Sequence, residues 1–151
     1  LDCSPRGDPA GFVRVVDEKT LMIPDRRGNN RIDTLRNIVR DPRVSLLFLV
    51  PGVGETLRIN GRAKISVDPE LCGSFDMNGK TPRSVIIVTT DRVYFQCQKA
   101  LARSRLWDPE AQVERKELPT AGKILQSLSR DEFDGEAYDR NYPERLKKTI
   151  Y

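Results

Sequence analysis

The sequence predicts a mainly β fold, a small antiparallel β-barrel with one inserted helix and a helical C-terminal tail. Three observations lead to this prediction. Apolar and polar residues alternate strictly from residue 56 to 67, which is typical of a strand with one buried face. The connections between the β-rich runs are short, which favours antiparallel neighbours. The clearest helical patterns are one near residues 32–39 and two in the last third of the chain.

The β-rich first part of the chain predicts a hairpin followed by the inserted helix. The runs Phe12–Val16 and Thr20–Pro24 are separated by three polar residues, so we expect them to pair. Apolar residues then recur at helical spacing up to Asp41-Pro42, where the helix should end because a residue before proline is pushed out of the α region. Asn30 or Asp33 is the expected N-terminal cap of this helix.

The middle of the chain predicts the remaining strands. Residues 44–50 are almost all apolar and should form a central strand covered on both faces. In the alternating strand that follows, Gly61 falls among the inward residues, where a bend or bulge is expected. A connection with a helical turn at residues 69–75 leads to two further runs, 83–90 and 92–97, with a possible break at Thr90-Asp91.

The tail has a different character. Thr120 is placed to cap a helix that carries Ile124, Leu125 and Leu128, and a second helix is expected from residue 134 to 149, interrupted or restarted at Pro143. We expect residues 1–151 to form a single domain with 108–151 as its helical tail. Because the chain opens without a methionine or a capped element, we also expect it to lack an N-terminal segment of that domain.

The composition excludes several classes of function. No histidine is present, which removes the commonest general base and metal ligand, and the cysteines Cys3, Cys72 and Cys97 lack the spacing of a zinc site or a disulfide framework. We therefore expect no metal and a reducing, cytoplasmic location. No apolar run reaches the ~20 residues of a membrane helix, and no signal peptide is evident. The 26 basic residues are interleaved with 22 acidic ones, so neither a membrane nor a nucleic acid is an expected partner.

One loop has the composition of an anion site. Glycine and asparagine at residues 28–30 stand among arginines directly before the predicted helix, whose first-turn N–H groups carry partial positive charge. Arg31 would add a forked donor for phosphate oxygens. The alternative is an ordinary loop with solvated arginines.

A second cationic stretch covers residues 96–109. If it is helical, Lys99, Arg103 and Trp107 share one face that suits an anionic aromatic ligand. Alternatively, Leu101 and Leu106 face the core and the cations are solvated.

Together these stretches resemble the pyridoxamine 5′-phosphate oxidase-like family of FMN-binding split barrels. The matching pieces are LDCSPRGDPAGFV, LMIPDRRGNNRIDTLRNI, DPRVSLLFLVPG, ETLRINGRA and QCQKALARSRLW, in the order of the family and over most of residues 1–107. The last piece resembles a subgroup of uncharacterised relatives more than the oxidase itself. The end of the chain, ERLKKTIY, lacks the substrate-binding tail of the true oxidase.

The resemblance implies a homodimer with two FMN sites at the interface and a small-molecule substrate. Carried over by position, it assigns Ser4 and Arg6 to the first flavin-contacting strand and Ile23 and Pro24 to the next. It assigns the phosphate-binding turn and the remaining cofactor contacts to Asn30, Arg31, Thr34, Thr56, Lys99, Arg103, Ser104 and Trp107. No residue is assigned a catalytic role.

The implied activity is an FMN-dependent oxidoreductase that transfers a hydride through flavin N5. The alternatives are a deazaflavin-using reductase, a flavin-binding protein without turnover, and a nucleic-acid-binding barrel that uses the arginine-rich helix.

Overall fold

A computed structural model of the protein describes residues 2–28, 31–130 and 132–150, in two compact units, Leu1–Trp107 and Asp108–Tyr151. The first unit contains the sheet and the second contains helices only. That residues 108–151 complete the same domain stays a prediction.

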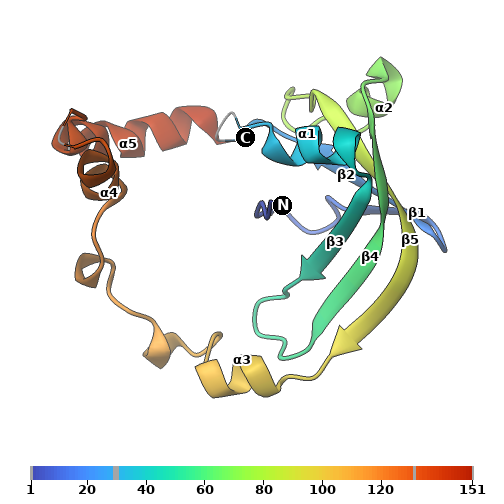
Figure 1. The fold of residues 1–151 in the computed structure, drawn as a ribbon, viewed down its shortest axis with the longest axis horizontal. Coiled ribbons are helices and arrows are strands. Elements are labelled where there is room, and N and C mark those ends of the chain that lie inside the picture. The colour runs from blue at the N-terminus through green and yellow to red at the C-terminus, as the bar shows by residue number, and fades with distance from the viewer. Residues whose placement is uncertain (1, 29–30, 131, 151) are drawn as a thin grey trace. The chain divides into compact units, whose positions relative to one another are not determined.

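A five-stranded sheet organises the first unit. Its strands are β1 (Arg14–Asp17), β2 (Thr20–Asp25), β3 (Arg43–Phe48), β4 (Thr56–Ser66) and β5 (Ser84–Gln96). They lie in the order β1-β2-β5-β4-β3, and each neighbouring pair is antiparallel. The long strands β4 and β5 bend along their length, so the sheet is curved (Figure 1). The mainly β, antiparallel fold with attached helices is confirmed.

The prediction that residues 44–50 form the central strand is wrong. Of these residues, 44–48 belong to β3, an edge strand that pairs with β4 alone among the described strands and whose residues alternate between exposed and half-buried. The central strand is β5, because it pairs with β2 through its first half and with β4 along its whole length. A run of apolar residues therefore marked an edge here, where Leu47 is exposed on the outer face.

A bulge joins the two halves of β5. Residues 83–97 were expected to form two runs, but they form one strand in which Asp91 has no partner, since Asn60 pairs with Arg92 and Gly61 with Thr90. The expectation of an irregularity at Gly61 is confirmed. A Cβ atom at Gly61 would lie 2.2 Å from the Thr89 carbonyl oxygen, so only glycine allows the two strands to approach this closely.

Helices cover both faces of the sheet. Helix α1 (Asp33–Arg40) ends at Asp41, before Pro42, as expected, and its Ile38 joins the main core with residues of β2, β4 and β5. Helix α2 (Pro69–Gly73) is capped by Asp68 and places Cys72 against Val85 on the other face. Alternate residues of β5 thus enter two separate cores, one on each face of the sheet.

The second unit is built on two helices, α4 (Ala121–Leu128) and α5 (Gly135–Thr149), after the short turns η1 (Pro109–Ala111) and η2 (Arg115–Glu117). The Thr120 hydroxyl caps α4 as expected, at 3.2 Å from the Lys123 N–H. The helices touch through their backbones, because a Cβ atom at Gly122 would lie 2.1 Å from the Gly135 carbonyl oxygen.

Pro143 does not divide α5. The helix runs through it, which corrects the expected interruption. The fixed φ of proline is close to the helical value, so the cost is the loss of one backbone hydrogen bond and local crowding, and this helix tolerates both. In the part of the chain that the structure describes, no helix is long and apolar enough to cross a membrane.

Candidate functional site

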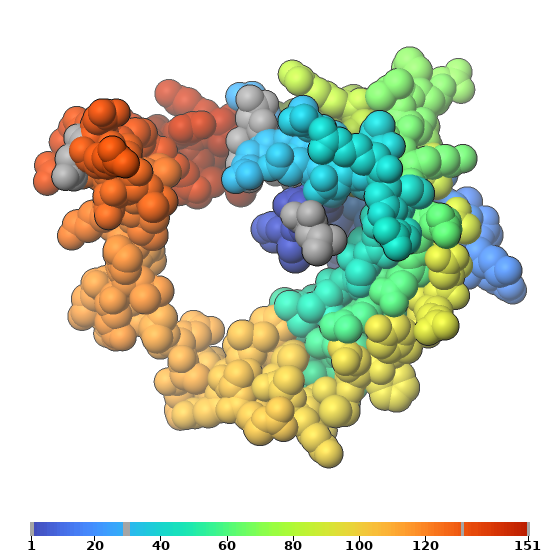
Figure 2. Space-filling view, in the orientation of Figure 1, coloured from blue at the N-terminus to red at the C-terminus, as the bar shows by residue number. Residues whose placement is uncertain are grey.

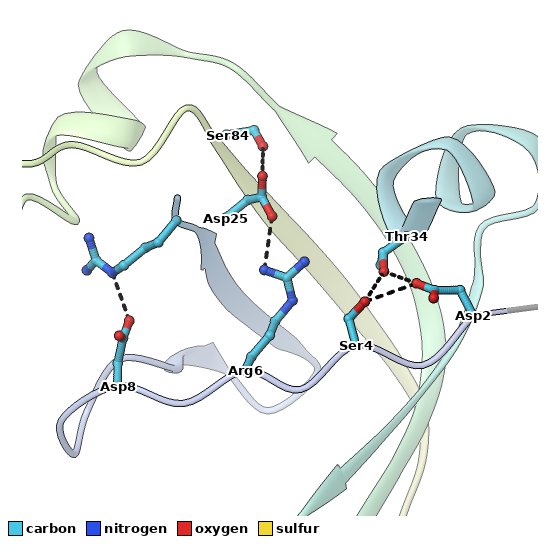
Figure 3. Close-up of polar contacts among 8 residues, drawn as sticks. Asp2, Ser4, Arg6, Asp8, Asp25, Thr34 and Ser84 are labelled. Carbon is cyan, nitrogen blue, oxygen red and sulfur yellow. Dashed lines mark hydrogen bonds and ion pairs between the residues drawn. The ribbon is translucent and has the colours of Figure 1, made fainter. Parts of the chain in front are cut away.

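Three polar side chains meet at the start of α1. The Ser4 and Thr34 hydroxyl oxygens lie 2.9 Å apart, although thirty residues separate them in the sequence (Figure 3). The Asp2 carboxylate accepts hydrogen bonds from both, at 3.1 Å from Ser4 Oγ and with a short contact to Thr34 Oγ1. These hydrogen bonds, with that from Thr34 the strongest, hold the pKa of Asp2 below its ordinary value. The structure thus brings together two of the predicted site residues.

The start of α1 has no side-chain cap. Its N-cap is Ile32, with no side-chain hydrogen bond to the first turn, so the expectation that Asp33 caps the helix is wrong. Asp33 is the first helical residue, and its carboxylate instead accepts from Arg31 at 2.6 Å. That hydrogen bond and the negative charge of Asp33 raise the pKa of Arg31. Asn30, the other predicted cap and a predicted phosphate ligand, lies outside the described residues.

The N-terminal segment that carries Ser4 and Arg6 is irregular. Residues 2–8 form no strand, which corrects the expectation that Ser4 and Arg6 belong to one. Instead the segment is held by side chains: the Arg6 guanidinium donates to Asp25 Oδ1 at 3.0 Å, and Asp25 Oδ2 accepts from the Ser84 hydroxyl at 3.4 Å (Figure 3). At the surface the segment lies beside α1 (Figure 2).

Ile23 and Pro24 lie in β2 next to Asp25. Both are buried, and they pair with Ile86 and Val85 of β5. Ile23 is part of the main core, at 4% exposed. Their side chains therefore stabilise the sheet that supports this end of the site. Because those side chains are buried, a ligand would contact these two residues through their backbone.

One buried ion pair of this region was not predicted from the sequence. Arg26 donates from Nε to Asp8 at 2.8 Å, with side-chain exposures of only 7% and 6%, and from Nη2 to the Phe75 carbonyl oxygen at 2.9 Å. The pair ties the N-terminal segment to the end of β2 and to the loop after α2. The sequence offered no signal for this partner, because eighteen residues separate the two charges.

Aspartate carboxylates pair with some of the arginines in the arginine-rich region. Its six arginines are Arg26, Arg27, Arg31, Arg36, Arg40 and Arg43. Three of them, Arg26, Arg31 and Arg43, form ion pairs with aspartates. The side-chain hydrogen bond from Arg43 lowers the pKa of Asp41 to about 2. This pairing reduces the charge available to a polyanion while leaving the helix start polar.

The remaining predicted residues gather elsewhere. Thr56 is the buried first residue of β4, and Lys99, Arg103 and Ser104 lie on α3 (Lys99–Ser104), with both cations exposed. The helix ends at Arg105, whose φ of 52° is left-handed, so Trp107 does not continue the face of Lys99 and Arg103 as expected. Trp107 Nε1 instead donates to the Val53 carbonyl oxygen at 2.8 Å and fixes the loop between β3 and β4.

The two groups of predicted residues lie at opposite ends of β4. Thr56 pairs with Gln96, whereas Ile65 pairs with Ile86, the partner of Ile23. The ten residues from Thr56 to Ile65 are separated by nine steps along the strand, a path of roughly 30 Å at about 3.3 Å per residue. This path is longer than one mononucleotide, and because β4 bends along its length it is an upper limit on the straight distance between the two ends.

Neither of two shallow depressions in the described surface is lined by a predicted site residue. One lies along α1, at Leu35, Arg36, Val39 and Arg40, and the other lies on α5 beside Phe133 and Tyr138. The described residues also contain no group of three His, Cys, Asp or Glu side chains arranged to hold a metal.

Comparison with known proteins places the chain in a family. Residues 2–97 match the family model described as pyridoxamine 5′-phosphate oxidase. HupZ of Group A Streptococcus is 20% identical over 57% of this chain and 70% of its own, with a TM-score of 0.46. A provisionally named pyridoxamine 5′-phosphate oxidase of Lactobacillus delbrueckii is 20% identical over 56% and 68%, with a TM-score of 0.42. No curated protein matches. Because the family model covers more than half of the residues, this chain belongs to the pyridoxamine 5′-phosphate oxidase-like family.

Proposed function

We propose that this protein is an FMN-dependent oxidoreductase that acts on a small molecule. The observation that supports it most is the meeting of Ser4 and Thr34 at an uncapped helix start, beside Arg31. All three residues lie within the part of the chain that matches the family model, and members of that family typically bind flavin.

The side chains at this helix start suit a phosphate group. Two hydroxyls, a guanidinium and the first-turn N–H groups of α1 are all hydrogen-bond donors, and charge-assisted bonds from such groups are the strong ones. Arg31 is 74% exposed, so its guanidinium reaches a ligand once it leaves Asp33. The donor set therefore matches the phosphate of a mononucleotide better than it matches an uncharged ring.

The chain's own residues would bind and orient the cofactor. When bound, FMN supplies the hydride chemistry at N5. The Asp25 carboxylate holds Arg6 next to Ser4, and the Asp8–Arg26 pair fixes the same segment to the sheet. Since the sequence contains no histidine, proton exchange with the substrate would use water or another side chain.

A homodimer would unite the two separated groups of residues. The ~30 Å path along β4 keeps Thr56 and α3 away from Ser4 and Thr34 within one chain. A second copy of the chain can supply the missing group at the interface. Apolar side chains at the Thr56 end of the sheet support this proposal. Leu57, Val93 and Phe95 are 40%, 55% and 74% exposed, and a partner chain would cover them. Sedimentation of the protein with FMN should report two chains, and a monomer that binds FMN fully would refute the shared site.

Titration with FMN and riboflavin tests the cofactor assignment. FMN should bind more tightly, because only FMN carries the phosphate. Arg31→Ala should weaken FMN by roughly ten- to a hundredfold, the loss expected for one charge-assisted hydrogen bond, and leave riboflavin unchanged. The matched control is Arg36→Ala, another exposed arginine of the same region, which should change neither affinity.

Equal binding of FMN and riboflavin would show that the helix start does not bind phosphate. A second measurement, steady-state reduction of the bound FMN by NADH or NADPH, distinguishes an enzyme from a flavin carrier. A protein that binds FMN tightly and shows no turnover with any donor would leave the binding site standing and refute the oxidoreductase.

A further inference from the structure

At the start of α1, the Asp2 carboxylate occupies the place in which the proposed site would bind a phosphate. It accepts hydrogen bonds from Thr34 and from Ser4, the two hydroxyls that the proposed phosphate site requires. Figure 3 shows the side chains of Asp2, Ser4 and Thr34 pointing toward one another, with Asp2 and Ser4 on the N-terminal segment and Thr34 on the helix. Arg31 also acts on Asp2, since its charge helps to keep this carboxylate ionised.

In this arrangement the hydroxyl protons of Ser4 and Thr34 already form hydrogen bonds within the cluster. A hydroxyl has one proton to donate, and that of Thr34 is directed at Asp2. The Ser4 proton is directed at Asp2 or at Thr34 Oγ1, which lies 2.9 Å away. Neither hydroxyl can donate to a phosphate oxygen while Asp2 stays in place. Asp2 and a phosphate would also repel each other, since both are negative.

We propose that Asp2 is a built-in competitor for the phosphate, so that FMN binds only by displacing its carboxylate from Ser4 and Thr34. This inference rests on the proposed function. Asp2 is exposed, and its carboxylate accepts from those two hydroxyls and from the backbone of the neighbouring Cys3, all outside the core, so the carboxylate can leave without disturbing the core. The contact therefore lowers FMN affinity while it keeps the hydroxyls ordered in the free protein.

The test is equilibrium titration of the full chain with FMN and with riboflavin. Asp2→Asn keeps the shape of the side chain and removes its charge, and Asp2→Ala removes the acceptor as well. Both variants should bind FMN about five- to fiftyfold more tightly than the unaltered chain, the range expected when one unit charge close to a partly exposed anion is removed. Riboflavin affinity should stay the same.

The control is Asp17→Asn, which removes an exposed carboxylate of the β1–β2 turn that accepts from the Lys19 N–H. It should leave FMN affinity unchanged. If the Asp2 variants bind FMN no more tightly while FMN is still preferred to riboflavin, Asp2 is not a competitor and the phosphate site stands. If the unaltered chain and the Asp2 variants bind FMN and riboflavin equally, or neither, the phosphate site itself is refuted, and the role of Asp2 with it.

Discussion

Replacing Arg26 by methionine tests whether the buried ion pair with Asp8 holds the N-terminal segment in place. Methionine keeps much of the apolar stem of arginine and removes the charge. The change leaves the Asp8 carboxylate, only 6% exposed, without the guanidinium 2.8 Å away. It also removes the donor of the hydrogen bond to the Phe75 carbonyl oxygen.

The expected loss is large for a domain of this size. Removing one partner of a buried ion pair costs about 3–5 kcal/mol, because the other charge stays buried without compensation. A whole domain is stable by about 5–15 kcal/mol. For a unit of about a hundred residues, ~1 kcal/mol shifts the melting temperature by about 4–8 °C, so the transition of the variant should fall by at least ~12 °C.

Thermal unfolding followed by circular dichroism measures this loss. The matched control is Arg27→Met, the neighbouring exposed arginine, which should change the melting temperature little. The double variant Asp8→Asn with Arg26→Met removes both charges and should recover part of the loss. If Arg26→Met melts within a few degrees of the unaltered chain, or if the double variant is less stable than the single one, the ion pair does not hold the segment.

Three further predictions concern other parts of the chain. Gly122→Ala should destabilise the α4–α5 pair by about 1–3 kcal/mol, since its Cβ would meet the Gly135 carbonyl oxygen, and a normal helical melt would contradict the close contact. Because Arg43 lowers the pKa of Asp41 from 3.8 to about 2, the stability that this carboxylate adds is present above pH 3.8 and is lost as the pH falls through about 2. An NMR titration of Asp41 with a midpoint near 3.8 would exclude that pairing. Trp107→Phe removes a single hydrogen-bond donor and should cost about 0.5–1.5 kcal/mol by chemical denaturation, and unchanged stability would show that the indole N–H adds nothing.

Much of the local structure could be predicted from short windows of sequence. The helix that ends at Asp41, the cap at Thr120 and the irregularity at Gly61 were all predicted and are confirmed. Each depends on dihedral preferences and hydrogen bonds among residues a few positions apart. The position of the apolar run 44–50 was predicted wrongly, because periodicity reports that a strand is apolar and not which strands flank it.

The candidate site was predicted only in part. The resemblance named Ser4 and Thr34, and the structure places their hydroxyls together, whereas Thr56 and α3 lie at the far end of β4. Asp2 was not predicted, since its contacts to Thr34 span 32 residues.

The sequence by itself determined most of the strands and helices and the family of this chain. Only the tertiary structure decided that β5 is the central strand, that Arg26 is held by Asp8 and that Asp2 accepts hydrogen bonds from both Ser4 and Thr34. The reason is physical. A helix turn or a strand face is set by neighbours within a few residues, but the partner of a charge or of a strand edge is set by how the whole chain buries its apolar surface, which brings distant residues together.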